Sequence, residues 1–309
     1  MKKKLMALLL VFTMTAGTLA GCATPGSSEK PAASETGAKQ GEEGKSAGQE
    51  DRITLTYAQT KDVDSLDPRN ATSTITAAMM AQIFSALVTT DEDYNIVCDA
   101  AESYELIDDC TYKFTLKKGI KFHDGVEMTS EDVKYTMDTI HAEGADYKLK
   151  SDFSFMYCEP IDDYTMYIKT DEPNASTLLR LNYIKIIPKH YVEQVGDSEF
   201  NAKPIGSGPY RMVEWNKDAS IKLEAFSDYF GTKPAADELI CKVIPEASAR
   251  IAALEAGEVD LISAVTTSQI SRLNSLGNIE VVSKPTTRTV YYTMNSFGDS
   301  PVTDLKVRQ

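Results

Sequence analysis

The sequence predicts a mixed α/β fold from about residue 51 onward. Short stretches with apolar residues at every second position, typical of half-buried strands, alternate with longer stretches whose apolar residues fall three or four apart, as on one face of a helix. Clusters of Gly, Pro, Asn and Asp separate these stretches as turns. Because strand and helix patterns alternate along the chain instead of segregating, the class is α/β or mixed α+β.

The ordered part begins with a strand and a helix. Residues 53–57 alternate apolar and polar side chains and predict a half-buried strand. Residues 74–89 predict a helix that Ser73 or Thr74 caps, since serine and threonine are favoured at that position. The apolar residues of its predicted inner face are four apart: Ile75, Met79, Ile83 and Leu87.

A meander and a second helix follow. Residues 102–106 and 112–116 are strand-like, and the turn Asp108-Asp109 joins them. A helix begins at Thr129, with Asp132 three residues later in a variant of the capping box. The buried face of this helix is expected to carry three apolar side chains, Val133, Met137 and Ile140.

The rest of the chain continues the alternation. Predicted strands cover 164–169, 184–187, 211–215, 221–226, 239–244 and 290–295. Asn216-Lys217-Asp218 forms the loop of a hairpin between two of them. Predicted helices cover 175–181 and 246–255, and Gly257 suits the cap that ends the second. A further helix opens within 301–309.

The first 21 residues predict a secretory signal. Three lysines, Lys2 to Lys4, precede an apolar run over 5–16 and then small residues. The apolar run is too short to span a bilayer, which takes about 20 such residues. The following segment, 22–50, consists largely of Gly, Ser, Ala, Glu, Lys and Pro and has no aromatic residue, so we expect a disordered tether.

A cysteine directly after Leu19-Ala20-Gly21 distinguishes this signal from an ordinary one. The four residues resemble the lipobox of bacterial lipoproteins, in which the Cys22 thiol would take a diacylglyceryl group and become the new first residue. Two lipid chains hold a protein on a membrane where a single chain lets it leave. The alternative is a plain secreted protein with a chance cysteine in its signal.

Charge and cysteine spacing exclude two kinds of site. The formal net charge of −14 becomes −17 once the three signal lysines are removed, and so acidic a chain is not expected to bind nucleic acid. The remaining cysteines, Cys98, Cys110, Cys158 and Cys241, lie in no CxxC or zinc-like spacing, so no metal site is predicted. Cys98 and Cys110 could form a disulfide, because the chain reverses between them, and free thiols are the alternative.

No catalytic residue is predicted. The chain has neither an HExxH nor a GxSxG motif, and its three histidines, His123, His141 and His190, have no serine or cysteine at a catalytic spacing. His123-Asp124-Gly125 lies between a strand and a helix, where the glycine meets the needs of a turn. An extracellular lipid-anchored hydrolase is therefore a competing class without a supporting motif.

One ordered set of segments resembles a known family. The set comprises 100–104, 112–125 and 129–133, together with Ser65-Leu66-Asp67-Pro68, 206–211 and 252–261. These segments resemble the signature of family 5 extracellular solute-binding proteins, which are the binding components of dipeptide, oligopeptide and nickel ABC importers. The set extends over nearly all of the chain after the tether.

The resemblance implies a type II periplasmic-binding-protein-like fold, in which two lobes close over a ligand and an extra domain packs on the first lobe. Mapped onto this chain, the signal takes 1–21, the tether 22–50, lobe I 51–83 and 204–288, the inserted extra domain 84–203, and the start of lobe II 289–309. We expect the chain to be the N-terminal part of a longer protein, with the second lobe truncated.

The resemblance also implies a lipid-anchored substrate-binding component of an ABC importer, not an enzyme. Such a protein would capture di- and oligopeptides on the extracytoplasmic face of the cell membrane, at the cell surface or in the periplasm, and deliver them to a permease heterodimer driven by ATPases. Nickel chelates or another small solute are the alternative ligands. We expect a monomer without a cofactor. Thr72, Ser73 and Thr74 match a ligand-facing segment by position, and the alternative is that they only cap a helix.

Overall fold

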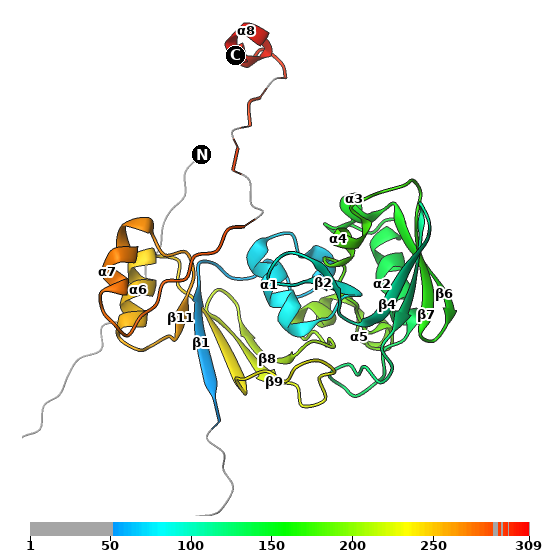
Figure 1. Ribbon diagram of the computed structural model, residues 1–309, viewed down its shortest axis with the longest axis horizontal. Coiled ribbons are helices and arrows are strands. Elements are labelled where there is room, and N and C mark those ends of the chain that lie inside the picture. The colour runs from blue at the N-terminus through cyan, green and yellow to red at the C-terminus, as the bar shows by residue number, and fades with distance from the viewer. Residues whose placement is uncertain (1–51, 287–289, 292, 296, 309) are drawn as a thin grey trace, which may run out of the picture. The chain divides into compact units, whose positions relative to one another are not determined.

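The structure is a computed structural model that describes residues 52–286, 290–291, 293–295 and 297–308 (Figure 1). The predicted signal, the tether and Cys22 lie outside the described residues. Two larger sheets and eight α-helices make up most of the described part. None of the helices in these ranges is both long and apolar enough to cross a bilayer.

The helices differ widely in length. The α-helices are α1 (Thr74–Ile83), α2 (Ser130–His141), α3 (Lys150–Phe153), α4 (Thr177–Leu181), α5 (Lys189–Ala202), α6 (Ala247–Glu255), α7 (Ile270–Asn274) and α8 (Leu305–Arg308). Short 3-10 helices are η1 (Pro68–Asn70), η2 (Thr267–Gln269) and η3 (Pro301–Thr303). Only α1, α2, α5 and α6 are longer than two turns, and α5 is kinked at Gly196, which has a φ of 77°.

One sheet has five strands in the order β11-β1-β10-β9-β8. In that order the strands are Leu261–Ile262, Thr54–Gln59, Glu238–Val243, Ser220–Ala225 and Tyr210–Asn216. β1 runs parallel to β10 and β11, whereas β9 runs antiparallel to β10 and β8. The sheet therefore joins a segment before residue 60 to segments after residue 209. This is the arrangement expected of a discontinuous lobe I, whose boundaries stay a prediction.

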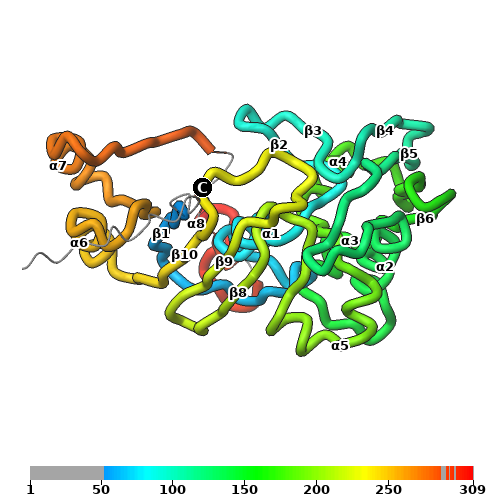
Figure 2. Tube along the Cα trace, turned by 90° about the horizontal axis from the view of Figure 1, so that it is seen from below, coloured from blue at the N-terminus to red at the C-terminus, as the bar shows by residue number. Residues whose placement is uncertain are grey.

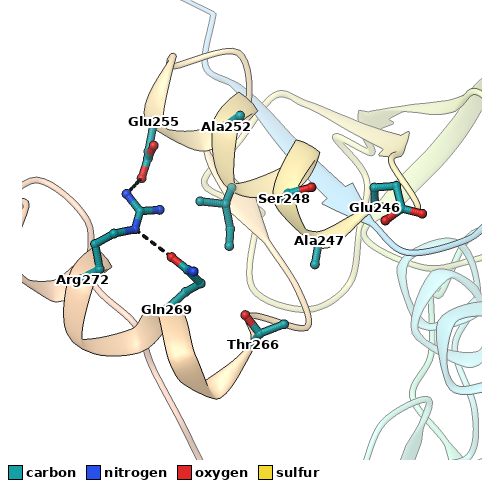
Figure 3. Close-up of a pocket in the computed structure, with 9 residues that line it drawn as sticks. Glu246, Ala247, Ser248, Ala252, Glu255, Thr266, Gln269 and Arg272 are labelled. Carbon is teal, nitrogen blue, oxygen red and sulfur yellow. Dashed lines mark hydrogen bonds and ion pairs between the residues drawn. The ribbon is translucent and has the colours of Figure 1, made fainter.

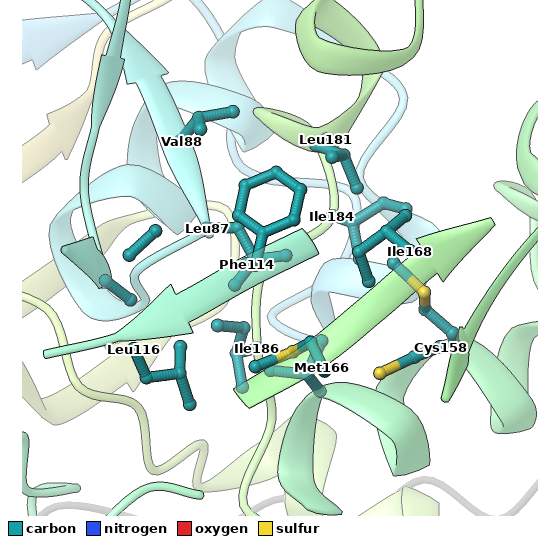
Figure 4. Close-up of a cluster of buried hydrophobic side chains, with 14 of the residues drawn as sticks. Leu87, Val88, Phe114, Leu116, Cys158, Met166, Ile168, Leu181, Ile184 and Ile186 are labelled. Carbon is teal, nitrogen blue, oxygen red and sulfur yellow. The ribbon is translucent and has the colours of Figure 1, made fainter. Parts of the chain in front are cut away.

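The other sheet has four antiparallel strands in the order β4-β5-β7-β6. In that order they are Ala101–Asp108, Thr111–Leu116, Thr165–Thr170 and Met156–Asp162, and a small hairpin of β2 (Val88–Thr90) and β3 (Ile96–Cys98) precedes them. Phe114 and Leu116 of β5 and Met166 and Ile168 of β7 alternate with more exposed residues and enter one core (Figure 4). Figure 2 shows α2 and α3 near this sheet, and Figure 1 shows α6 near β11 of the other sheet.

Local signals in the sequence position the starts of the two main helices. Ser73 caps α1, because its Oγ accepts a hydrogen bond from Thr76 N at 3.2 Å. α2 begins after Thr129, whose N–H donates to the Asp132 carboxylate at 2.9 Å, as the predicted capping box requires. The predicted inner face of α2 is confirmed, since Val133, Met137 and Ile140 are all buried.

α1 is shorter than predicted. It ends at Ile83, where the chain becomes extended at Phe84, and not at Thr89. Leu87 is buried, but it lies one residue before β2 and not on the helix. The series of apolar residues four apart runs on past the helix because Leu87 is buried in the core beside β2.

Two predicted strands are wrong. Residues 184–187 form no strand, since Ile186 N donates to Ser85 O at 2.9 Å and Ile187 N donates to Thr136 Oγ1 at 3.0 Å. Within 290–295, none of the described residues is in a strand, and Val290 is 85% exposed. Both stretches have the composition of a strand. A strand also needs a neighbour that offers a ladder of main-chain groups, which composition does not reveal.

The suggested Cys98–Cys110 disulfide is also wrong, because both thiols are free. Cys98 ends β3 and Cys110 lies in the β4–β5 turn, so the eight residues of β4 lie between them, an extended length on the order of 25 Å. A disulfide requires a Cα separation below about 7 Å. Burial raises the pKa of the Cys158 and Cys241 thiols to about 12, which keeps these two protonated and unreactive.

A second core joins the five-stranded sheet to α1 and α5. It includes Met80 and Ile83 of α1, Ile221 of β9 and Phe200 of α5. The rings of Phe84 and Phe200 meet edge to face, with centroids 6.1 Å apart. α5 falls within the predicted extra domain, so its apolar side chains tie that segment to the predicted lobe I.

Candidate functional site

A groove of about 1220 Å³ lies over the five-stranded sheet beside α1. Its floor is one face of that sheet, because Leu55, Tyr57 and Gln59 alternate along β1 and so share a side. Leu239 and Cys241 of the parallel strand β10 stand in register with Leu55 and Tyr57 and line the floor with them. The sequence indicated the alternation in β1, but not which strand would lie beside it.

α1 and the loop before it form one wall of the groove. Thr74, Ala78 and Gln82 recur at every fourth position on α1 and line the groove together with Ile75 and Met79. The other lining residues come from loops and strands: Thr60, Lys61, Thr72, Ser73, Tyr94, Tyr183, Tyr210, Leu261, Ser263, Ala264 and Thr286. Among all lining residues one is charged and four are tyrosines, so the groove is a largely neutral surface.

The three residues singled out by the sequence, Thr72, Ser73 and Thr74, all lie on the groove wall. Thr72 and Thr74 are exposed. The Ser73 hydroxyl is used within the chain, since it accepts from Thr76 N and donates to Thr76 Oγ1 at 2.9 Å. This segment therefore both caps α1 and lines the groove. Whether these residues touch a ligand stays a prediction.

The groove lies where the parallel strands end. Thr60 and Lys61 continue from the carboxyl end of β1, and Ser263 and Ala264 continue from that of β11. In open α/β sheets ligands bind outside the carboxyl ends of the strands. The topology of the sheet and the position of the cavity thus indicate the same location for a ligand site.

Arg250 of α6 holds two of these strand ends together. Its side chain is nearly fully buried and donates hydrogen bonds to four main-chain oxygens, those of Ile244, Pro245, Ser263 and Ala264. Ile244 directly follows β10 and Ser263 directly follows β11. The guanidinium suits this role because it has five N–H donors in a fixed plane.

A buried ion pair anchors the loop that leads from β1 to α1. The Arg69 guanidinium donates to Asp67 and to Asp197, each at 2.7 Å, and it lies over the Tyr147 ring at 4.1 Å from the centroid. The side chains of Arg69 and Asp67 are 1% and 3% exposed. Burial opposes the charge on Arg69, but its bonds to Asp67 raise its pKa above the ordinary value. The loop continues directly into the groove wall.

His123 joins two of the segments that carry the sequence resemblance. Its Nδ1 accepts from Gly206 N at 3.2 Å, so the neutral ring has its hydrogen on Nε2, which lies 3.1 Å from Gly208 O and donates to it. Gly208 N in turn donates to Ile83 O at 2.9 Å, at the end of α1. This histidine therefore positions the helix that walls the groove, in agreement with the structural interpretation of His123-Asp124-Gly125.

Acid is expected to destabilise the protein through His123. Burial lowers the pKa of this imidazole to about 4 from its ordinary 6.5. Because the unfolded chain binds the proton first as the pH falls, the stabilisation is complete above about pH 6.5 and declines toward pH 4, by up to about 3 kcal/mol. Urea unfolding at a series of pH values between 7 and 4 measures this slope, which His123→Asn is expected to reduce.

His190→Asn is the matched control for that experiment. The His190 ring is 37% exposed and contacts Asp124 at 2.7 Å, whereas His123 contacts the glycine segment, Gly206-Ser207-Gly208. Its replacement is expected to leave the wild-type slope nearly unchanged. Equal slopes for the wild type and His123→Asn would contradict the assignment of the pH dependence to His123.

Two further pockets are smaller than the groove. One of about 440 Å³ lies between α6 and α7 (Figure 3), where Arg272 bonds to Glu255 at 2.6 Å and to Gln269 Oε1 at 2.7 Å. The other, of about 500 Å³, adjoins Tyr147 and Asp197. Nowhere in the described ranges do three or more His, Cys, Asp or Glu side chains gather as a metal site. The groove beside α1 is therefore the candidate site.

Sequence comparison decides the family of the chain. The family model described as "Bacterial extracellular solute-binding proteins, family 5 Middle" matches residues 95–309, which is more than half of the chain. The chain is a family 5 extracellular solute-binding protein. Proteins of this family bind solutes for transport and are not enzymes, so the competing class of extracellular hydrolase is set aside.

Two curated relatives of this family 5 protein are described by the ligands they bind. It is 33% identical over 238 residues to the oligopeptide-binding protein AppA of Bacillus subtilis, a match over 74% of this chain and 43% of AppA. It is 29% identical over 287 residues to the dipeptide-binding protein of Escherichia coli, over 83% of this chain and 53% of that protein. The chain thus spans about half the length of these relatives.

Solved structures confirm the type II periplasmic-binding-protein fold. AppA of Bacillus subtilis in complex with a nonapeptide matches with a TM-score of 0.68 and 31% identity, over 72% of this family 5 protein and 46% of AppA. NikZ of Campylobacter jejuni in complex with Ni(L-His) matches with a TM-score of 0.65 and 25% identity, over 72% and 45% of the two chains. The fold is thus shared by proteins whose described ligands differ.

Proposed function

We propose that this family 5 protein is the lipid-anchored substrate-binding component of an ABC importer, which captures peptides in the groove beside α1 and delivers them to a permease. The anchor would be the diacylglyceryl group on Cys22, and the segment 22–50 would let the folded part move on the extracytoplasmic face of the membrane. A monomer would capture a peptide by lobe closure and then dock on a permease heterodimer driven by ATPases.

The groove over the sheet is the observation that carries the proposal. Its floor and wall are largely neutral and rich in tyrosine, and Lys61 is its one charged lining residue. A surface of this kind suits a peptide main chain, which is held by hydrogen bonds independent of the peptide's sequence, while pockets accept different side chains. The names of AppA and of the Escherichia coli relative support the same ligand class.

Thr72, Ser73 and Thr74 are proposed as contacts to the peptide. Their position on the groove wall supports this assignment. The hydroxyls of Thr72 and Thr74 are exposed and can donate or accept, whereas Ser73 would act through its main chain because its hydroxyl caps α1.

A nickel chelate is the second candidate ligand, and the NikZ complex is the reason to consider it. The groove itself favours it less, because none of its described lining residues is a histidine. The two candidates differ in a simple measurement, since a peptide would act without metal and a chelate would require it.

Peptides are expected to raise the melting temperature of the complete product of this gene. Linkage requires this of any ligand that binds only the folded state, and the gain is about 2.7 kcal/mol at a ligand concentration of 100 times Kd. Thermal unfolding is measured with a mixture of synthetic peptides, and in parallel with nickel and histidine. The 309-residue chain without its signal is measured beside it, to show whether the groove alone binds. A complete protein that does not respond to peptides would refute the proposed peptide capture, and a response to nickel with histidine would then favour the second candidate.

A further inference from the structure

The floor of the groove holds a polar group without a partner. Gln59 is 2% exposed, and its Nε2 makes no hydrogen bond with any described residue. The main chain at this position is fully engaged, since Gln59 O accepts from Ile244 N at 2.9 Å and the residue pairs with Val243 in the parallel register. The main-chain groups of Gln59 therefore have partners in the sheet, whereas its side-chain Nε2 has none.

An unpaired donor shielded from water is costly, because folding removes its hydrogen bonds to water and replaces them with nothing. Buried polar groups in native structures usually have partners, so an exception calls for an explanation. Within the described residues there is one comparable atom, Ser207 Oγ. Ser207 lies in the glycine segment behind α1 and is not among the residues that line the groove.

Gln59 differs from Ser207 in its position. It follows Leu55 and Tyr57 on the same face of β1, so it belongs to the floor of the groove at the carboxyl end of the strand. The groove lining carries further donors, the hydroxyls of Thr72 and Thr74 and the ammonium of Lys61, which also pairs with Asp64 at 3.2 Å. A ligand with oxygen acceptors would meet several donors here.

We propose that Gln59 is a ligand-binding residue whose amide N–H donates to a carbonyl or carboxylate oxygen of the bound peptide. The inference rests on the proposed function and adds to it the residue that selects for an oxygen acceptor in the ligand main chain. Nε2 is shielded from water in the empty protein, so the amide must rotate about its last side-chain torsion to point an N–H at the ligand oxygen. The unpaired amide then lowers the stability of the empty protein, and ligand binding removes this destabilisation.

The test compares Gln59→Met with the wild type in the complete gene product. Methionine has nearly the same length and shape but no polar hydrogen. We expect its Kd for the best single peptide from the mixture to rise about tenfold, equal to about 1.4 kcal/mol. The melting temperature without peptide is expected to stay the same or to rise, because the unpaired donor is gone. These opposite effects on binding and on stability are not expected of a residue with a purely structural role.

Ser207→Ala is the matched control, because it removes the other unpaired buried atom outside the groove. It is expected to leave the Kd unchanged. Gln59→Glu adds a second arm: a carboxylate cannot donate to a carbonyl oxygen, so it should weaken binding more than methionine does.

The possible failures are distinguishable. A wild-type Kd retained by Gln59→Met would overturn the role of Gln59 and leave the proposed function intact. A melting temperature that falls in Gln59→Met without peptide, together with the affinity, would also overturn it, since the amide would then be structural. A wild type that binds no peptide would instead refute the proposed function itself.

Discussion

Replacing Gly206 with alanine is expected to lower the melting temperature by roughly 6 to 12 °C. A Cβ added there would lie 2.0 Å from Ile83 O, and one added at Gly208 would lie 2.6 Å from Ile83 C, so the main chain itself must move. Overpacking of this kind costs about 3 kcal/mol, and 1 kcal/mol corresponds to about 2 to 4 °C in a chain of this size. Calorimetry of Gly206→Ala and Gly208→Ala measures it.

Gly144→Ala is the control for that loss. Gly144 has a φ of 78° and no atom within 4 Å of an added Cβ, so alanine there meets only backbone strain, of about 1 kcal/mol. If Gly206→Ala destabilised no more than Gly144→Ala, the close approach of the glycine segment to the end of α1 would be contradicted. Comparing the two variants separates the steric effect of the added Cβ from the backbone strain that alanine meets at a positive φ.

Arg69→Met is expected to destabilise the protein by about 3 to 5 kcal/mol. Removing one partner of a buried ion pair leaves the other charge unpaired in the interior, which costs far more than the pair is worth. Here the stranded group is Asp67, whose side chain is 3% exposed and keeps only its hydrogen bond from the main chain of residue 69. Urea unfolding with a linear extrapolation measures the change.

Arg211→Met serves as the comparison for Arg69→Met. Arg211 also binds a carboxylate, Glu224 at 2.6 Å, but its side chain is 52% exposed, so the loss is expected to stay below about 1 kcal/mol. Arg52 pairs with the same carboxylate at 2.6 Å and further reduces the effect. Equal losses at the two arginines would mean that the Asp67–Arg69 pair is open to water in solution.

Elements with a local signature were predictable from the sequence, whereas the pairing of segments that are distant in sequence was not. The capping box at Thr129, the serine cap of α1 and the hairpin loop at Asp218, which has a φ of 60°, each depend on a few adjacent residues. The false strand at 184–187 has the right composition, but its N–H groups are used by Ser85 and Thr136 from elsewhere in the chain. No prediction covered β6, α5 or the β2–β3 hairpin.

The candidate site was predictable only in part, for the same reason. Thr72 to Thr74 were found because they match a family segment by position, and they do lie on the groove. The floor was missed, although the alternation of Leu55 and Tyr57 was visible, because its position as floor follows from the parallel pairing of β1 with β10. The unpaired amide of Gln59 has no signature in sequence, since glutamine at the end of a strand is unremarkable until its surroundings are known.

The parallel pairing of β1 and β10 also constrains the order in which the chain can fold. Thr54 pairs with Glu238, so this pairing must close a loop of more than 180 residues, which costs conformational entropy and slows its formation. The sheet β4-β5-β7-β6 closes within residues 101–170 and can form long before. We therefore expect the sheet that contains β1 to form after the sheet β4-β5-β7-β6.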